Sequence, residues 1–313
     1  MPSLLARFAE NIYWLGRYLE RAENLSRILD INETYARDDA GGPSWRRVLD
    51  LYADTERFAA NHETIDVHSV VWYYLFDRDN PSSIVNCIDL ARENARSVRH
   101  LISTEMWTQV NVFRKELSEM RTTKVGVANL SGLCHQVIHG CQSFEGVAEG
   151  TFFRGEPWCF YQIGKYIERA DQTTRILDMG YDRLSAGEGY SGAWVDWNVL
   201  LRSVCGYHAY RSRHPGVSNP HDIATFLLYD TEFPRAAALC VERITSRLQE
   251  IERRHMERRK PGVEAKRREL EFLLETGPGR ELTPQSLHHY LDQIQIALAA
   301  LSDEVGRAYF TGR

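Results

Sequence analysis

The sequence predicts an all-α fold in which two diverged copies of one helical unit follow each other along the chain. Three observations lead to this prediction. Apolar residues recur at the three- and four-residue spacing of amphipathic helices, the alternation typical of strands is nearly absent, and a segment near the N-terminus is repeated near the middle. We expect the copies to form helical-bundle halves that pack into one compact body with an approximate internal twofold axis.

The predicted helices are separated by short loops that contain glycine or proline. Asn80, Asn219 and Thr283 each precede a proline, which favours a helix start with the proline at its first position. The first half is predicted to form helices at residues 4–37, 45–61, 65–77, 81–102, 105–121 and 124–150. The second half is predicted to form helices at residues 157–183, 193–211, 220–230, 234–260, 263–275 and 284–310.

The repeated segment is the strongest sign of a duplication. Residues 13–30 and 161–178 share ten identical positions among 18, and six more are conservative replacements. Two weaker matches follow in the same order at slightly larger offsets, residues 73–88 with 226–241 and residues 152–155 with 309–312. We therefore predict a tandem duplication, with residues 1–155 as the first helical repeat and residues 156–313 as the second.

Bulk composition narrows the class of protein. The chain is 43% hydrophobic and 26% charged, and its net charge of −5 argues against non-specific nucleic-acid binding, which needs a basic surface. No apolar run approaches the length of a membrane span, and early charges at the N-terminus argue against a secretory signal. The six cysteines form no Cys-x-x-Cys pair, which indicates reduced, mostly buried thiols. We expect a cytoplasmic protein that binds neither nucleic acid nor membrane.

The polar face of the leading helix is what the two copies share, although an ordinary surface helix conserves its apolar side. Both copies also keep a glycine, Gly16 or Gly164, one turn before a Glu-Arg pair. A glycine inside a helix costs roughly 1 kcal/mol relative to alanine, so we expect another backbone or a bound molecule to approach closely there. The shared polar positions are Tyr13/Tyr161, Arg17/Lys165, Glu20/Glu168, Arg21/Arg169, Asn24/Gln172 and Arg27/Arg175.

This face has two interpretations that do not exclude each other. It is either a buried ionic network that fixes helix packing or an anion site in which Arg21 and Arg169 present forked donors and Glu20 and Glu168 orient them. A pseudo-twofold arrangement would bring both motifs to one central cavity, with Trp158 beside the second motif. The candidate ligand-binding residues are Arg17, Glu20, Arg21, Asn24, Arg27, Arg154, Trp158, Lys165, Glu168, Arg169, Gln172 and Arg175.

The other motifs in the sequence indicate no metal-binding, nucleotide-binding or catalytic site. The string Cys134-His135-x-x-x-His139-x-Cys141 places its cysteines on different faces from its histidines, so we interpret it as core or surface residues and predict no metal. No phosphate-binding loop, dinucleotide fingerprint or nucleophile elbow occurs in the sequence. We therefore predict no cofactor and assign no catalytic residue.

The segments GRYLERAENLSRILD and GKYIERADQTTRILD, with TFFRGEPWCF just before the second, resemble the alpha-E family, a bacterial all-helical family named for its Glu-Arg motif. The similarity covers essentially the whole chain. Lys165 stands where the family usually has arginine, which argues against a bidentate role there, and Gly155 to Pro157 vary the stretch before Trp158. The resemblance implies a gene neighbourhood with ATP-grasp-type amide ligases and transglutaminase-like proteins.

Three functional hypotheses follow. The resemblance favours an accessory or scaffold protein that works with an ATP-grasp-type ligase in forming or modifying peptide-like amide bonds. A second hypothesis is an enzyme or binding protein that holds an anionic phosphate or carboxylate ligand between the two Glu-Arg motifs. A third is a purely structural motif.

Overall fold

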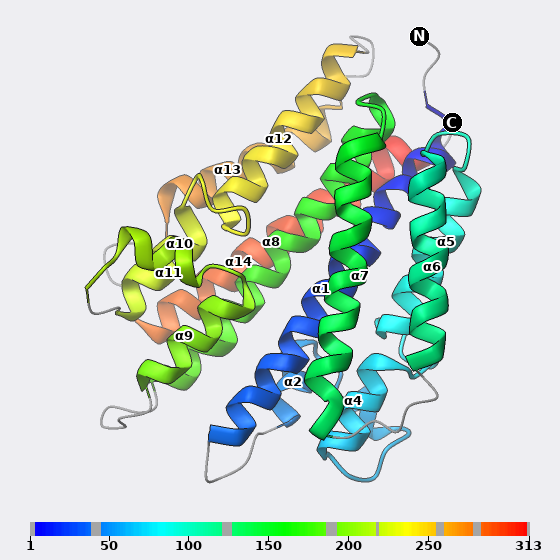
Figure 1. The fold of residues 1–313 in the computed structure, drawn as a ribbon. Helices are drawn as coiled ribbons and strands as arrows, with labels where there is room; N and C mark the ends of the chain where they lie inside the picture. The colour runs from blue at the N-terminus through cyan, green and yellow to red at the C-terminus, as the bar shows by residue number, and fades with distance from the viewer. Residues whose placement is uncertain are drawn as a thin grey trace. The chain divides into compact units, whose positions relative to one another are not determined.

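The structure is a computed structural model, and it describes residues 4–38, 45–120, 127–185, 193–216, 219–254, 260–277 and 283–311 (Figure 1). Every regular element within these ranges is a helix, which confirms the predicted all-α class. None of the helices in the described ranges is both long enough and apolar enough to cross a membrane.

The chain folds into two compact units. The terminal unit contains residues 1–17 and 154–313, and the middle unit contains residues 18–153. The first helix, α1 (Ala6–Asp38), contributes its first turns to the terminal unit and the rest to the middle unit. The tandem division near residue 155 concerns the origin of the sequence and stays a prediction.

The middle unit is built on the later turns of α1 and on α5, α6 and α7. Helix α6 packs against both α5 and α7, and α4 packs against α5 (Figure 1). Its core is lined by leucine, isoleucine, valine and phenylalanine side chains, such as Ile88, Phe113 and Phe144. The helices of this unit that follow α1 are α2 (Trp45–Leu51), α3 (Thr55–Ala59), α4 (Val67–Leu75), α5 (Ile84–Ser97), α6 (Thr104–Met120) and α7 (Val127–Thr151).

The terminal unit is built around α8, which packs against α12 and α14, while α13 packs against α12 and α14. Its helices are α8 (Glu156–Ser185), α9 (Ala193–Ser203), α10 (Tyr207–Arg213), α11 (Pro220–Tyr229), α12 (Ala237–Arg254), α13 (Pro261–Thr276) and α14 (Pro284–Val305). A π-helical turn, η2 (Gly306–Phe310), continues α14, so the predicted helix at residues 284–310 changes its hydrogen-bonding pattern near its end.

Two predicted helices are wrong in the same way, because each is broken in the middle. The predicted helix at residues 45–61 divides into α2 and α3 around Ala53, and that at residues 193–211 divides into α9 and α10 around Cys205. Both residues adopt positive φ, 52° and 58°, which ends a right-handed helix. Neither is glycine or asparagine, the residues that ordinarily mark such a position, so the sequence carries no signal for the break.

The predicted helix starts are right at two sites and wrong at one. Asn219 accepts a hydrogen bond from the Asp222 backbone N–H at 2.7 Å, and Thr283 caps α14. Asn80 caps no helix, because its side chain donates to the Tyr73 carbonyl at 3.1 Å and accepts from the Ser82 N–H within the loop. Ser83 caps α5 instead.

Candidate functional site

The two motif glycines lie at a close approach of helix backbones inside the terminal unit. A Cβ added to Gly16 of α1 would lie 2.5 Å from the Tyr161 carbonyl oxygen of α8. A Cβ added to Gly164 would lie 2.1 Å from the Tyr13 carbonyl oxygen of α1. Each glycine therefore faces the carbonyl three residues before the other glycine, a reciprocal contact that no residue with a side chain permits. The predicted close approach is confirmed, and the neighbour is another backbone.

A buried ion pair lies one turn beyond this contact. Arg17 donates from Nε and Nη2 to Oε2 of Glu168 at 2.9 and 2.8 Å, and Glu168 is only 1% exposed. Arg17 Nη1 also donates to the Ser302 hydroxyl of α14 at 2.9 Å, and that hydroxyl lies 2.7 Å from the Tyr13 hydroxyl. We call these four residues the Arg17–Glu168 cluster. It joins α1, α8 and α14 through charge-assisted hydrogen bonds.

Sequence reasoning placed three members of this cluster at the site but missed the fourth. Ser302 is 285 residues from Arg17 and belongs to no motif of the sequence, so only its contact with the arginine identifies it. The contact between Glu168 and Arg17 links the two copies of the motif. The expectation that Glu168 orients its neighbour Arg169 stays a prediction.

Aromatic rings accompany the other cations of the second motif. The Lys165 Nζ lies 5.3 Å and the Arg169 guanidinium carbon 5.6 Å from the centre of the Tyr166 ring, within the range of cation–π attraction. Further out, the guanidinium carbon of Arg154 lies 3.6 Å above the ring of Trp158, which is buried. Trp158 therefore stacks with an arginine close to the start of α8.

The rest of the second motif is held along its own helix. Arg175 donates from Nε to the Asp171 carboxylate at 2.8 Å, an i,i+4 ion pair. Gln172 is buried, and Thr173 beside it donates to the Arg235 carbonyl at 2.9 Å, which ties α8 to the loop before α12.

The residues of the first motif that follow Arg17 in the sequence belong to the middle unit. Glu20 and Asn24 are buried, and the Asn24 amide donates to Glu20 at 3.1 Å. Arg27 donates from Nη2 to Glu23 at 2.7 Å, and both are buried. Arg21 lies with its guanidinium carbon 6.0 Å from the Tyr18 ring. Sequence reasoning missed Glu23, although its position four residues before Arg27 could have identified it.

Burial beside these carboxylates makes a nearby thiol unreactive. Cys141 of α7 is fully enclosed, and burial together with the negative charges of Glu23 and Glu20 raises its pKa well above the ordinary value. A thiol held protonated is a poor nucleophile and a poor metal ligand. Among the six cysteines only Cys205 is exposed, which confirms the predicted mostly buried thiols.

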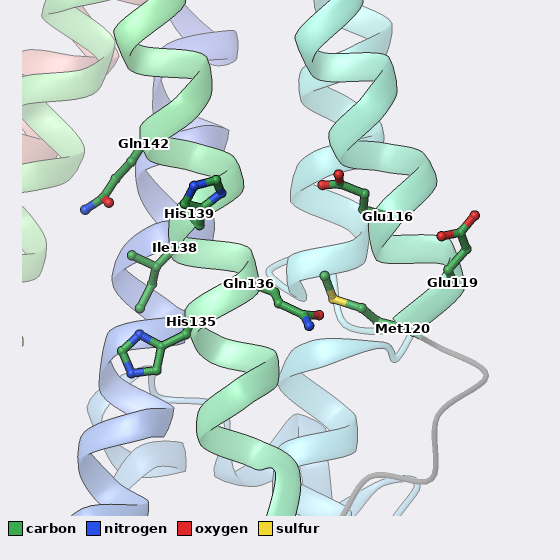
Figure 2. A pocket seen from close by; sticks show the side chains of 8 residues that line it. All are labelled: Glu116, Glu119, Met120, His135, Gln136, Ile138, His139 and Gln142. Atoms are coloured by element: carbon green, nitrogen blue, oxygen red, sulfur yellow. The ribbon is translucent and has the colours of Figure 1, made fainter.

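The cysteines and histidines of the segment Cys134 to Cys141 on α7 lie on different faces of the helix, as predicted from their spacing. Cys134 and Cys141 are buried, whereas His135 and His139 are exposed on the opposite side. Figure 2 shows these histidines at an open groove of about 820 Å³ whose other side is formed by Glu116, Glu119 and Met120 of α6. The groove's described lining contains no residue of either Glu-Arg motif.

Comparison with known proteins gives a family and distant relatives. A family model described as a predicted alpha-helical domain with a conserved ER motif matches residues 4–310, which confirms the resemblance drawn from the two motif segments. Uncharacterised proteins of Mycobacterium bovis and Mycobacterium tuberculosis are 24% identical over 265 residues, covering 78% of this chain but 30% of each relative. The chain thus spans about a third of the length of these relatives. No solved structure matches it.

Proposed function

The chain belongs to the Alpha-E family, and from this premise we propose that it is a helical scaffold for a partner protein, with a Glu-Arg motif that fastens its helices together. The burial and pairing of Glu168 carry this proposal. Its carboxylate is 1% exposed and accepts two hydrogen bonds from Arg17, so the charge serves the packing of α1 on α8. Breaking a buried ion pair is costly, which makes such a pair a strong constraint on helix arrangement.

We propose an ATP-grasp-type ligase as the partner, in the formation or modification of peptide-like amide bonds. Two observations support a role beside another protein. The sequence contains no nucleotide-binding motif of its own, and the mycobacterial relatives carry the matching region as 30% of a longer chain. In those relatives the region is covalently joined to further sequence, an arrangement expected of a domain that works with a neighbour. A ligase that consumes ATP also favours action in the cytoplasm.

The second hypothesis, an anionic ligand held between the motifs, rests on Arg21 and Arg169. Each of these arginines lies near a tyrosine ring, Tyr18 for Arg21 and Tyr166 for Arg169. A thermal-shift comparison of the wild type with the Arg21→Ala, Arg169→Ala double variant tests it with inorganic phosphate. Phosphate at about 100 times its dissociation constant should stabilise a binding protein by about 2.7 kcal/mol.

We also propose that the chain arose by tandem duplication. The helix order supports it, since within the described ranges six helices follow α1 before α8 and six follow α8, with the same break after the first of them, at Ala53 and at Cys205. Burial supports it too, since α7 and α14 keep one register at an offset of 157 residues. The matching buried pairs are Leu130/Leu287, Leu133/Tyr290, Cys134/Leu291, Val137/Ile294, Cys141/Leu298, Phe144/Leu301 and Ala148/Val305.

The scaffold proposal is tested by binding. The full chain and an ATP-grasp-type ligase from the same organism should be co-expressed with a tag on one of them, and the two proteins purified separately should be measured by isothermal titration calorimetry. We expect a stoichiometric complex and a change in ligase turnover when the chain is present. The absence of heat at about 100 µM of each protein, a concentration well above ordinary specific dissociation constants, would remove the ligase as the partner.

A further inference from the structure

We propose that Asp178, His288 and Asp292 in the terminal unit form a binding site for a divalent transition-metal ion of the zinc class. Asp178 lies on α8, and His288 and Asp292 lie one turn apart on α14. One possible ligand atom from each side chain lies within 4.8 Å of the other two. The site involves no residue of the Glu-Arg motif and does not depend on the partner proposed above.

The first argument concerns the imidazole ring, which has a carboxylate on each side. Nδ1 of His288 lies 2.8 and 3.0 Å from the two oxygens of Asp178, and Nε2 lies 3.6 Å from Oδ2 of Asp292. A neutral imidazole has one N–H, so it donates to only one of these carboxylates and turns a lone pair toward the other. A cation on that lone pair satisfies both the ring and the second carboxylate.

The distances from the two ring nitrogens of His288 to the two carboxylates show which side chains would bind the metal directly. The contact with Asp178 is a hydrogen bond, which places the proton on Nδ1 and orients the ring. The 3.6 Å between Nε2 and Asp292 is too long for a hydrogen bond. It is close to the separation of two ligands that each lie about 2.0–2.2 Å from one zinc ion. His288 and Asp292 are therefore the direct ligands, and Asp178 completes a carboxylate–histidine–metal arrangement of the kind that fixes ligand geometry.

Exposure allows an ion to enter and leaves coordination positions open. The side chains of His288 and Asp292 are 62% and 49% exposed, whereas Asp178 is 25% exposed and is fixed on α8. A nitrogen and carboxylate donor set suits zinc and its neighbours in the first transition row better than calcium. Water would fill the remaining positions, so a carboxylate of a bound molecule could replace it.

A related aspartate–histidine pair occurs in the middle unit. Asp30, which aligns with Asp178 in the repeated segment, lies with Oδ2 3.7 Å from Nε2 of His135 on α7. His139 stands one turn beyond His135, as Asp292 stands one turn beyond His288. This pair is not equivalent to Asp178–His288, because at the offset of 157 residues His135 aligns with Asp292, so the proposed site is argued from the terminal unit alone.

The test is a calorimetric titration of the full chain with Zn²⁺ alone at about pH 7.5. We expect saturable binding that His288→Ala weakens at least about tenfold, with smaller losses in Asp292→Asn and Asp178→Asn. Binding should also fall below about pH 6, because the proton competes for the ring nitrogen.

His289→Ala is the matched control, because His289 is exposed on the adjacent position of α14 and lies outside the cluster. It should bind Zn²⁺ as the wild type does, and thermal melts should show that all four variants remain folded. Zinc held by His135 and His139 would be a background common to these proteins. Equal affinity in the wild type and His288→Ala, or no saturable binding up to about 1 mM, which corresponds to a negligible binding free energy for a metal site, would overturn the proposal.

Discussion

Two buried carboxylates in different units of the protein are compensated in different ways. Glu168 in the terminal unit and Asp54 in the middle unit are 1% and 4% exposed. Each contacts an arginine at 2.8 Å, but the Arg17 side chain is 14% exposed, whereas that of Arg57 is 52% exposed. Asp54 also accepts a hydrogen bond from the Tyr74 hydroxyl at 3.2 Å.

The difference shows that burial of the partner matters as much as its distance. Burial raises the pKa of Asp54 above its ordinary value, although Arg57 and Tyr74 act in the opposite direction, because an arginine that faces solvent is screened. The Arg17 side chain is less exposed than that of Arg57, so its charge is screened less, and loss of Glu168 would remove the carboxylate to which its Nε and Nη2 donate. The Arg17–Glu168 pair should therefore contribute strongly to the stability of the fold, and the Arg57–Asp54 pair only weakly.

Removing Glu168 should have the largest effect. We expect Glu168→Ala to lower the free energy of unfolding by about 3–5 kcal/mol, because Arg17 loses the buried carboxylate to which it donates two hydrogen bonds. Arg57→Ala, which removes the arginine of the middle-unit pair, should cost less than about 1 kcal/mol because that arginine is exposed. Urea denaturation followed by circular dichroism measures both.

A double-mutant cycle separates the pair from the loss of side-chain volume. The double variant Arg17→Ala, Glu168→Ala should be destabilised by less than the sum of the two single variants, with a coupling of at least about 1 kcal/mol. Strictly additive losses would show that the two charges do not stabilise each other, and the architectural role of the motif would then be wrong.

Closing the gap between α1 and α8 should have the next largest effect. Gly164→Ala places a methyl group 2.1 Å from the Tyr13 carbonyl oxygen, so the two helix backbones must separate. Overpacking of this kind costs about 1–3 kcal/mol, which exceeds the gain of roughly 1 kcal/mol in helix propensity. Gly16→Ala should also destabilise the protein, because its methyl group would lie 2.5 Å from the Tyr161 carbonyl oxygen.

The chain supplies a control for this substitution. Gly146 is exposed within α7 and has no atom within 4 Å of an added Cβ, so Gly146→Ala should stabilise the protein by up to about 1 kcal/mol through propensity alone. If Gly164→Ala raised the melting temperature as Gly146→Ala does, the close helix contact would be disproved.

These contrasts also show what the sequence could predict. The glycines and Glu168 were identifiable because the two copies keep them against a local cost. The choice of Arg17 as the partner was not, since 151 residues separate the pair and only packing brings them together. The contact of Asp178 with His288 likewise joins residues 110 positions apart, which local propensity and spacing do not contain.

The pH dependence of stability should show the smallest effect. A carboxyl group whose folded pKa is raised binds its proton more tightly in the folded state, so its contribution to stability is present below the unfolded pKa of 3.8 and is lost as the pH rises through the folded value. Asp54→Asn keeps the oxygen that accepts from Tyr74 and removes the titration. The wild type should therefore lose stability relative to this variant between about pH 3.5 and pH 7, by an amount comparable to one net hydrogen bond, about 1 kcal/mol. Urea denaturation of both proteins at several pH values measures the difference. The opposite result would be a rise in the stability of the wild type relative to Asp54→Asn as the pH increases. Arg57 would then stabilise the charged form of Asp54 despite its exposure, and the exposure of the arginine would not distinguish the two pairs.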